Sequence, residues 1–427
     1  MGRGKGRGTA RKRRRSRTAG ERVAAQGSLP ELSRLSHVPA FSDLEPSERQ
    51  REAYAEARAR AERTAAGARD LALACVVRLD RGFPAVAFEG GLTRAEFAAQ
   101  LTKGAYSRVA VGDWVCVRVP EGHEMGLIEE MLPRESDISR WRGGARGERQ
   151  TLAANVDTVL VAQALGQGGL SLDRIARSAV IARDCGAEVG VVLTKADRVS
   201  PEELADELTR VRGLLGTACP VAATAFESAA VAGARGDADA GLGCVGGGNG
   251  GGAVVADGGA FGAWERVARD AGAAWGTGGV RSLVASGTVA VVLGESGAGK
   301  STLLNTLIGQ DALETGAVRA GDDAGRHTTV ARRMVAVPGA GVIIDAPGLR
   351  SLPLVGHERG LAMVFGDVAE AARSCRFRDC THTREPGCAV LLGRAKGAFS
   401  PERVDTYVRL AAEMRASRDA LDPDVVL

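Results

Sequence analysis

The sequence of 427 residues has no long apolar run, few aromatic residues and no acidic residue among its first 20 positions. No apolar run between charged residues reaches the roughly 18 residues of a membrane span, and no apolar segment follows the basic start as in a secretory signal. We therefore expect a cytoplasmic protein without a membrane segment. Charged residues (25%) and hydrophobic residues (44%) are balanced as in folded chains, which excludes a fibrous or wholly disordered protein.

The basic residues are concentrated at one end of the chain. Nine Lys or Arg lie in the first 20 residues, so the remainder is net negative by five although the whole chain carries +4. Such a tail is typical of segments that bind RNA phosphates, and a solvated tail without a partner is the alternative. Aromatic residues make up only 4% of the chain, so we assign no base-stacking surface.

Composition divides the amino-terminal part of the chain into two segments. Residues 1–70 lack a strong apolar period, and we expect a disordered basic tail without a core, apart from a surface helix near Arg51–Arg63. Residues 71–135 contain short β-rich runs separated by turn residues, which predict an OB-like β-barrel. The runs are residues 71–79, 83–88, 106–111, 113–119 and 125–132.

The rest of the chain is predicted to form an α/β domain and a small C-terminal domain. After a linker at 137–150, a strand–helix–strand pattern opens an α/β P-loop domain over residues 150–355. Glycine-rich residues 227–262 are predicted to be a flexible insertion within it. Residues 356–427 are predicted to form an α-rich domain that contains a cysteine cluster.

A phosphate-binding motif lies between a β-branched strand and a predicted helix. Residues 294–301 fit G-x-x-x-x-G-K-[ST]. Backbone N–H groups of such a loop surround the β-phosphate, Lys300 reaches the β and γ oxygens, and the Ser301 hydroxyl ligates Mg²⁺. A glycine-rich turn without a ligand is the alternative. The expected nucleotide contacts are Gly294, Glu295, Ser296, Gly297, Ala298, Gly299, Lys300, Ser301 and Thr302.

Two switch elements follow the phosphate loop. Asp345 ends an apolar strand and begins D-x-x-G, in which the carboxylate supports Mg²⁺ and the N–H of Gly348 senses a γ-phosphate. Thr328 or Thr329 can close over the Mg²⁺, and the sequence leaves both open. Leu349 cannot orient the attacking water, so His327 is the candidate catalytic residue; a merely packed or solvated histidine is the alternative.

The TKAD motif (Thr194, Lys195, Ala196 and Asp197) follows a buried strand and indicates which base is bound. Asp197 there can accept hydrogen bonds from guanine N1–H and the exocyclic amine, a pair that adenine cannot donate, while Lys195 covers the ring. TKxD alone is common on surfaces, but its position after a strand and the presence of a P-loop favour guanine. Thr224 and Ala225 are candidates for a backbone N–H to the guanine carbonyl.

A second cluster has the spacing of a metal site. Cys375, Cys380, His382 and Cys388 follow the pattern C-x4-C-x-H-x5-C within 14 residues. Three thiolates and one imidazole suit a closed, structural Zn²⁺ site, and free or buried thiols are the alternative. The other five cysteines are scattered, so the sequence does not indicate a disulfide framework.

The order of the motifs is unusual, because TKAD precedes the phosphate loop. This order indicates a circularly permuted GTPase domain. With the OB-like barrel before it and the zinc motif after it, the chain resembles the bacterial ribosome small subunit-dependent GTPase A family over about residues 71–420. The segments that carry the resemblance are LAANVDTVLV, TKAD, LGESGAGKSTLLNTL, GRHTT, DAPGLR and CRFRDCTHTREPGCAV.

The resemblance implies an OB-fold, a permuted GTPase domain and a C-terminal zinc domain. It implies GTP hydrolysis with Mg²⁺, one structural Zn²⁺, and late maturation of the small (30S) ribosomal subunit, whose presence stimulates hydrolysis and whose rRNA is bound. We expect a monomer. A P-loop kinase or ATPase of metabolism and a nonhydrolysing GTP-dependent RNA-binding module stay open as alternatives. Many GTPases have Asn where this chain has Thr194, so we do not assume that this position bridges to the P-loop.

Overall fold

Five strands form a closed barrel, as the sequence predicts. The computed structural model describes residue 32 and residues 35–63, 70–80, 83–102, 109–120, 125–142, 148–166, 168–225, 261–309, 332–345, 354 and 356–419. Strand pairings close the ring in the order β1-β2-β3-β5-β4-β1, with β3 parallel to β5 and the other pairs antiparallel. The elements are β1 (Leu71–Asp80), β2 (Phe83–Phe88), β3 (Gly91–Phe97), α3 (Ala99–Thr102), β4 (Trp114–Arg118) and β5 (Met125–Met131).

One barrel strand lies elsewhere than predicted. Of the run expected at 106–111, the described residues 109–111 contain only an isolated bridge at Val111. The third strand is instead β3, whose Arg94 is buried and lies 2.7 Å from an oxygen of Asp80. A buried ion pair breaks the hydropathy alternation that marks a strand, which is why the pattern was missed.

A helix before the barrel packs on it. The expected surface helix is α2 (Glu48–Glu62), and η2 (Phe41–Asp43) precedes it. The Tyr54 hydroxyl of α2 donates to the carbonyl of Leu71 at 3.0 Å. Leu44 and Ala57 are buried in the core, so the expectation that the segment before the barrel lacks a core is wrong here.

The α/β domain is built on a sheet in the order β11-β10-β9-β8-β12-β14-β13, in which only β13 is antiparallel to its neighbour β14. The predicted strand–helix–strand unit is confirmed. The strands are β8 (Thr158–Ala164), β9 (Glu188–Thr194), β10 (Val221–Ala223), β11 (Ala274–Trp275), β12 (Val289–Leu293), β13 (Arg332–Ala336) and β14 (Val342–Asp345).

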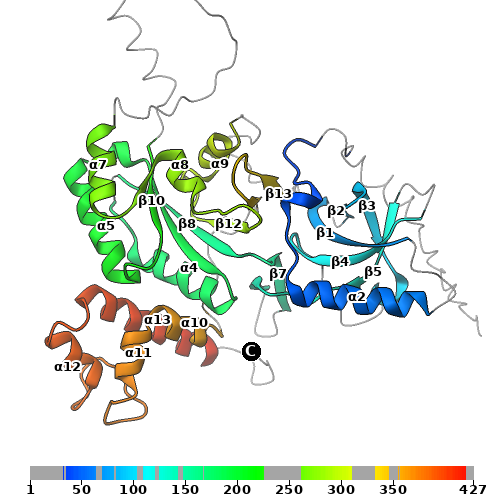
Figure 1. Ribbon diagram of the computed structural model, residues 1–427. Helices are drawn as coiled ribbons and strands as arrows, with labels where there is room; N and C mark the ends of the chain where they lie inside the picture. Colours follow the sequence, from blue (N-terminus) through cyan, green and yellow to red (C-terminus); the bar gives the residue numbers. More distant parts are fainter. Residues whose placement is uncertain are drawn as a thin grey trace, which may run out of the picture. The chain divides into compact units, whose positions relative to one another are not determined.

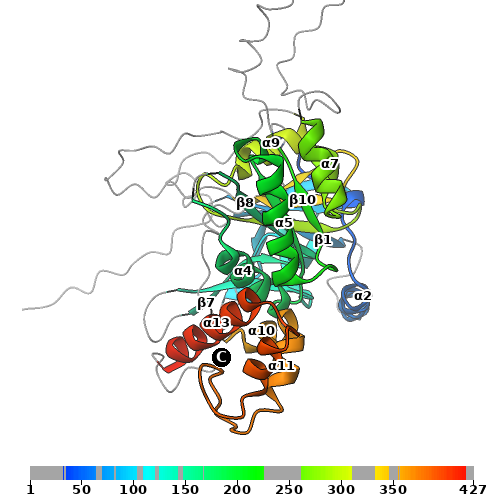
Figure 2. The ribbon, with the colours of Figure 1, turned by 90° about the vertical axis from the view of Figure 1, so that its left-hand side faces the viewer.

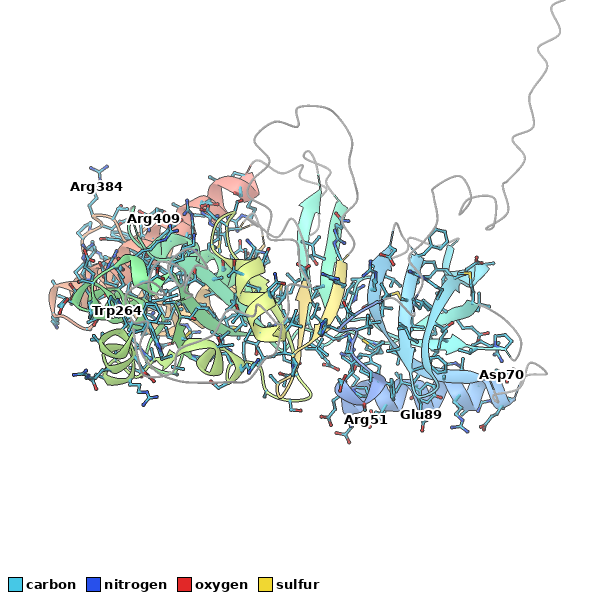
Figure 3. The ribbon with its side chains drawn as sticks, turned by 90° about the horizontal axis from the view of Figure 1, so that it is seen from above. Arg51, Asp70, Glu89, Trp264, Arg384 and Arg409 are labelled. Carbon is cyan, nitrogen blue, oxygen red and sulfur yellow. The ribbon has the colours of Figure 1, made fainter. Side chains whose placement is uncertain are left out.

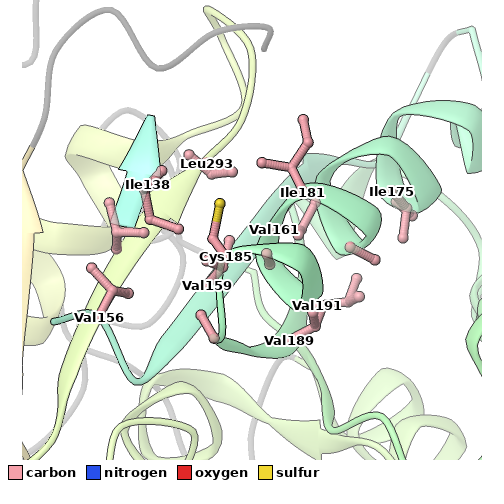
Figure 4. Packing of buried hydrophobic residues seen from close by; sticks show 14 of the residues in the cluster. Ile138, Val156, Val159, Val161, Ile175, Ile181, Cys185, Val189, Val191 and Leu293 are labelled. Carbon is pink, nitrogen blue, oxygen red and sulfur yellow. The ribbon is translucent and has the colours of Figure 1, made fainter. Parts of the chain in front are cut away.

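Helices cover both faces of this sheet. Because strand side chains alternate, Val159 and Val191 belong to the same buried cluster as Ile175 of α4 (Figure 4), whereas Leu160 packs in a separate cluster with Leu303 of α9. Helices α4 and α5 lie on the same face (Figure 2). The helices are α4 (Leu172–Asp184), η3 (Ala196–Arg198), α5 (Pro201–Leu215), α7 (Gly262–Asp270), α8 (Gly276–Arg281) and α9 (Lys300–Ile308).

The segment predicted as a linker is a hairpin. β6 (Asp137–Arg142) and β7 (Glu148–Ala154) pair antiparallel. Ile138 and Leu152 are buried in the core, so apolar packing overrides the glycine- and arginine-rich composition that suggested a linker. The predicted glycine-rich insertion lies outside the described residues except for Phe261 and Gly262, which begin a helix that the sequence analysis missed.

Strand β13 connects the two sheets. Besides its pairing with β14, it pairs antiparallel with β1 of the barrel, through Arg78 opposite Arg333 and Leu79 opposite Arg332. The barrel and the α/β domain therefore share one hydrogen-bonded sheet of 12 strands.

Four helices follow the α/β domain in the part of the chain that the structure describes, and α10 and α13 pack on its helices α4 and α5 (Figure 1). Gly360 of α10 lies so close to α4 that a Cβ there would overlap the carbonyl oxygen of Val180. The carboxylate of Asp184, at the end of α4, contacts Nδ1 of His357 at 2.8 Å and accepts from the N–H of Gly360 at 2.9 Å. The helices are α10 (Glu358–Val364), α11 (Gly366–Ala372), α12 (Ala389–Ala395) and α13 (Pro401–Asp419). None of the helices in the described ranges is long and apolar enough to span a membrane.

Candidate functional site

The phosphate loop connects β12 to α9. Gly299 caps α9 in the left-handed region at φ 77°, a conformation that costs glycine little. Lys300 Nζ donates to the carbonyls of Gly294 and Glu295 at 2.5 and 2.6 Å, so its ammonium lies over the loop. Ser301 is exposed in the first turn of the helix. The loop therefore brings together a helix N-terminus, a cation and an exposed hydroxyl, groups of the kind that bind phosphate and Mg²⁺.

The TKAD motif contacts the phosphate loop directly. Thr194 is fully buried at the end of β9, and its hydroxyl donates to the carbonyl of Ala298 at 2.8 Å. Lys195 adopts the left-handed conformation at φ 57°, and its Nζ donates to the carbonyl of Gly297 at 2.6 Å. Burial lowers the pKa of Lys195 and the charge of Arg198 acts in the same direction. A threonine thus bridges to the P-loop although it lacks the amide found at this position in many GTPases.

Thr224 lies beside the TKAD motif, at the end of β10. Its N–H donates to the carbonyl of Leu193 at 2.8 Å, and its carbonyl accepts from the N–H of Ala196 at 3.1 Å. These two hydrogen bonds place Thr224 and Ala225 next to the predicted base reader, Asp197, which is exposed in η3. The two hydrogen bonds therefore fix this segment beside the TKAD motif.

Asp345 ends β14, and β14 runs parallel to β12, so the carboxylate lies at the sheet edge that carries the phosphate loop. Burial raises the pKa of Asp345 above its ordinary value, although the positive charges of Arg333 and Lys300 act in the opposite direction. Arg333 Nε lies 3.9 Å from its Oδ2. Asp345 and the Ser301 hydroxyl offer oxygen ligands of the kind that Mg²⁺ prefers. The predicted residues His327, Thr328, Thr329 and Gly348 lie outside the described residues.

Cys375, Cys380, His382 and Cys388 converge in the loop between α11 and α12. Their ligand atoms all lie within 4.8 Å of one another. His382 Nδ1 is 3.4 Å from Sγ of Cys388 and 3.6 Å from Sγ of Cys375, and these two sulfurs are 3.8 Å apart. Zn–S bonds of about 2.3 Å in a tetrahedron place sulfurs roughly 3.8 Å apart, so the donor set fits Zn²⁺.

Glu385 shapes this loop and was missed in the sequence analysis. Its carboxylate accepts from the backbone N–H groups of Thr381, Thr383 and Arg384 at 2.7 to 3.0 Å. The hydrogen bond from the Thr381 hydroxyl, followed by those from the backbone N–H groups of Thr381 and Arg384, holds the pKa of Glu385 well below its ordinary value. The signal was an acidic residue three positions from each of two ligands, because a carboxylate offers two charged oxygens that can accept from several N–H groups at once.

The chain matches one family model and is similar to proteins that carry the name of that family. The family model described as RsgA GTPase matches residues 131–230 and 269–355. The small ribosomal subunit biogenesis GTPase RsgA of Streptomyces avermitilis is 36% identical over 338 residues, 79% of this chain and 78% of the relative. The protein of the same name from Opitutus terrae is 37% identical over 323 residues, 74% of this chain and 75% of the relative.

Two solved structures share the fold. YjeQ from Thermotoga maritima aligns with a TM-score of 0.54 at 19% identity, over 82% of this chain and 100% of that chain. YloQ, described as a circularly permuted GTPase, aligns with a TM-score of 0.53 at 18% identity, over 82% and 97% of the two chains. The fold predicted from the order of TKAD and the P-loop is therefore confirmed.

Proposed function

Because the chain belongs to the RsgA GTPase family, we propose that it hydrolyses GTP as a maturation factor of the small ribosomal subunit. The observation that carries this function is the contact between the TKAD motif and the phosphate loop, in which Thr194 and Lys195 donate to Ala298 and Gly297. A base reader and a phosphate cradle joined in this way suit one guanine nucleotide. The alternatives of a metabolic kinase or a nonhydrolysing RNA-binding module are not supported by the relatives.

Asp197 reads guanine by accepting from N1–H and the exocyclic amine, and the neighbouring Ala225 offers its N–H to the guanine carbonyl. The exposed position of Asp197 in η3, beside the segment that follows β10, supports this assignment. Lys195 lies between Asp197 and the phosphate loop, where its stem can cover the base.

The phosphates are bound by the N–H groups of residues 294–302 and by Lys300. Ser301 and Asp345 hold Mg²⁺, together with Thr328 or Thr329. When bound, the ion neutralises charge on the β- and γ-phosphates. Because Leu349 has no hydrogen-bonding group, His327 orients the attacking water, and the N–H of Gly348 contacts the γ-phosphate.

Zn²⁺ is held by Cys375, Cys380, His382 and Cys388 as a structural ion, because four protein ligands leave no open position for chemistry. The basic residues at the start of the chain contact rRNA phosphates on the small subunit. The factor acts in the cytoplasm as a monomer.

The test is steady-state turnover of GTP with and without purified small ribosomal subunits. We expect slow turnover alone and a large stimulation by subunits, with GTP rather than ATP competing for the site. Equal turnover in both conditions, or equal competition by ATP, would contradict the proposed function.

A further inference from the structure

A segment that the family model does not match ends in a helix that packs next to the TKAD motif. The family model passes over residues 231–268, and the structure describes the end of that stretch, Phe261 and most of α7. Helix α7 packs on α5, which begins directly after the TKAD motif (Figure 1). Trp264 of α7, labelled in Figure 3, donates its indole Nε1–H to the carbonyl of Val199 at 2.9 Å.

Val199 closes the short turn that carries Asp197. It is the C-cap of η3, and its N–H donates to the carbonyl of Ala196 at 3.3 Å. At the other end of this turn, the N–H of Ala196 donates to Thr224 at 3.1 Å. The turn is therefore held at both ends, by Thr224 on one side and by Trp264 on the other, while the Asp197 carboxylate projects from its middle.

The indole is itself held in place. Phe261 contacts Trp264 edge-to-face, with ring centroids 6.0 Å apart at 78°, and contacts Trp275 at 6.4 Å. Trp264 is half-buried, and an indole N–H can only donate, so the Val199 carbonyl is its partner in this packed position.

We infer that Trp264 is a positioning residue that sharpens guanine specificity by holding the turn that carries Asp197. The inference rests on the proposed role of Asp197 as the guanine reader. One carboxylate can accept hydrogen bonds from both N1–H and the exocyclic amine only when it is accurately oriented, whereas a single bond tolerates a looser orientation. A looser turn should therefore weaken the binding of guanine nucleotides more than the binding of hypoxanthine nucleotides, because hypoxanthine lacks the exocyclic amine.

The test compares the dissociation constants of GDP and IDP. Trp264→Phe keeps a ring on α7 and removes the donor to Val199. We expect the affinity for GDP to fall roughly two- to tenfold, the effect of one lost hydrogen bond, while the affinity for IDP changes little. The matched control is Trp275→Phe, which removes an indole from the same aromatic group and leaves the Val199 contact in place. It should preserve the GDP/IDP ratio, by which we mean the affinity for GDP divided by the affinity for IDP.

The outcomes distinguish a failure of the proposed guanine assignment from a failure of the inference about Trp264. Asp197→Asn, measured in parallel, must reduce the GDP/IDP ratio; if it does not, the guanine assignment fails whatever Trp264 does. If Asp197→Asn reduces the ratio but Trp264→Phe leaves it unchanged, or weakens both nucleotides equally, then Trp264 only packs α7 and the inference is wrong.

Circular dichroism reports whether Trp264→Phe folds. If it does not fold, Phe261→Leu is used instead, because it keeps the indole donor and removes the edge-to-face contact that holds it. We expect a smaller fall in the GDP/IDP ratio in this variant, and an unchanged ratio overturns the inference.

Discussion

The hydroxyl of Thr194 and the carbonyl of Ala298 form a 2.8 Å hydrogen bond that joins the base-reading motif to the phosphate loop. Both residues are buried, so neither group can exchange this bond for one with water. The contact connects the end of β9 to the turn before α9, although 104 residues separate the two positions along the chain.

Replacing Thr194 by Val should weaken nucleotide binding. The isosteric side chain fills the same space but leaves the Ala298 carbonyl unsatisfied, at a cost of about 1–3 kcal/mol. We expect GTP and GDP affinities to fall together, because the phosphate loop is disturbed rather than the base contact. Titration with a fluorescent GDP analogue measures the effect, and Thr194→Ser, which keeps the hydroxyl, should bind nearly as the wild type does. Equal affinities for Val and Ser variants would show that the bond is not needed.

Asp197→Asn should change the nucleotide preference from guanine to xanthine. The amide presents a donor where xanthine has a carbonyl, so GTP binding should weaken and XTP binding should improve. Competition between XTP and GTP for the variant measures the ratio of its affinities for the two nucleotides. Asp206→Asn, an exposed carboxylate on α5, is the matched control. Unchanged preference for GTP in the Asp197 variant would refute the assignment.

Freshly purified protein should contain about one tightly bound zinc per chain. Cys380→Ser removes one of four ligands and should unfold the loop between α11 and α12 while GTP binding persists. Elemental analysis and nucleotide titration on the same samples measure both effects. Cys219→Ser, which alters a half-buried thiol in the α/β domain, should keep its zinc. A wild-type preparation without zinc would remove the basis for this site.

The contact between Asp184 and His357 should make the anchoring of α10 dependent on pH. Burial tends to raise the pKa of Asp184, but the hydrogen bond and charge of His357 and the N–H of Gly360 lower it below its ordinary 3.8. A carboxyl with a lowered pKa stabilises the folded state above its ordinary value, and this contribution is lost as pH falls through the folded value.

Asp184→Asn should therefore reduce protection of the α10 amides against hydrogen exchange by about 1 kcal/mol near neutral pH, and the two proteins should converge as pH falls through the lowered pKa of Asp184. Exchange rates corrected for their intrinsic pH dependence give the difference. Glu370→Gln, in an exposed ion pair, is the control and should change protection little. A difference that persists unchanged at low pH would mean that the carboxylate charge is not responsible.

His327→Ala should remove most of the turnover stimulated by small subunits and spare nucleotide affinity. We expect a loss on the order of 10² if the imidazole orients the water, since Leu349 cannot do so. Turnover at saturating subunits and separate binding measurements distinguish the two effects. Full stimulation of the variant would mean that another group orients the water.

The fold followed from the sequence where packing and hydrogen-bonding patterns are local. The strands before TKAD and the P-loop are apolar runs followed by glycine or polar turns, and the helix from Pro201 carries a complete capping box at Ser200 and Glu203. The zinc ligands were found because four soft donors lie within 14 residues. These signals depend on neighbours in the chain.

Contacts between distant residues gave no such signal. From the sequence alone, Arg94 would be predicted to be a solvent-exposed charge, because nothing near it in the chain indicates its partner Asp80 on β1. Likewise, nothing near Trp264 indicates that its indole meets Val199, because 65 residues separate them. The bridging role of Thr194 was not expected, since its partner is a backbone carbonyl and carries no residue identity.

The pairing of β13 with β1 also bears on how the α/β domain can be handled in isolation. An unpaired strand edge offers a row of free N–H and C=O groups to other chains, and natural sheets cover or blunt such edges. Here the barrel supplies that cover, through the register of Arg78 and Leu79 against Arg333 and Arg332. A fragment trimmed to the nucleotide-binding domain would leave this edge of β13 unpaired beside Asp345, where it could pair with another chain.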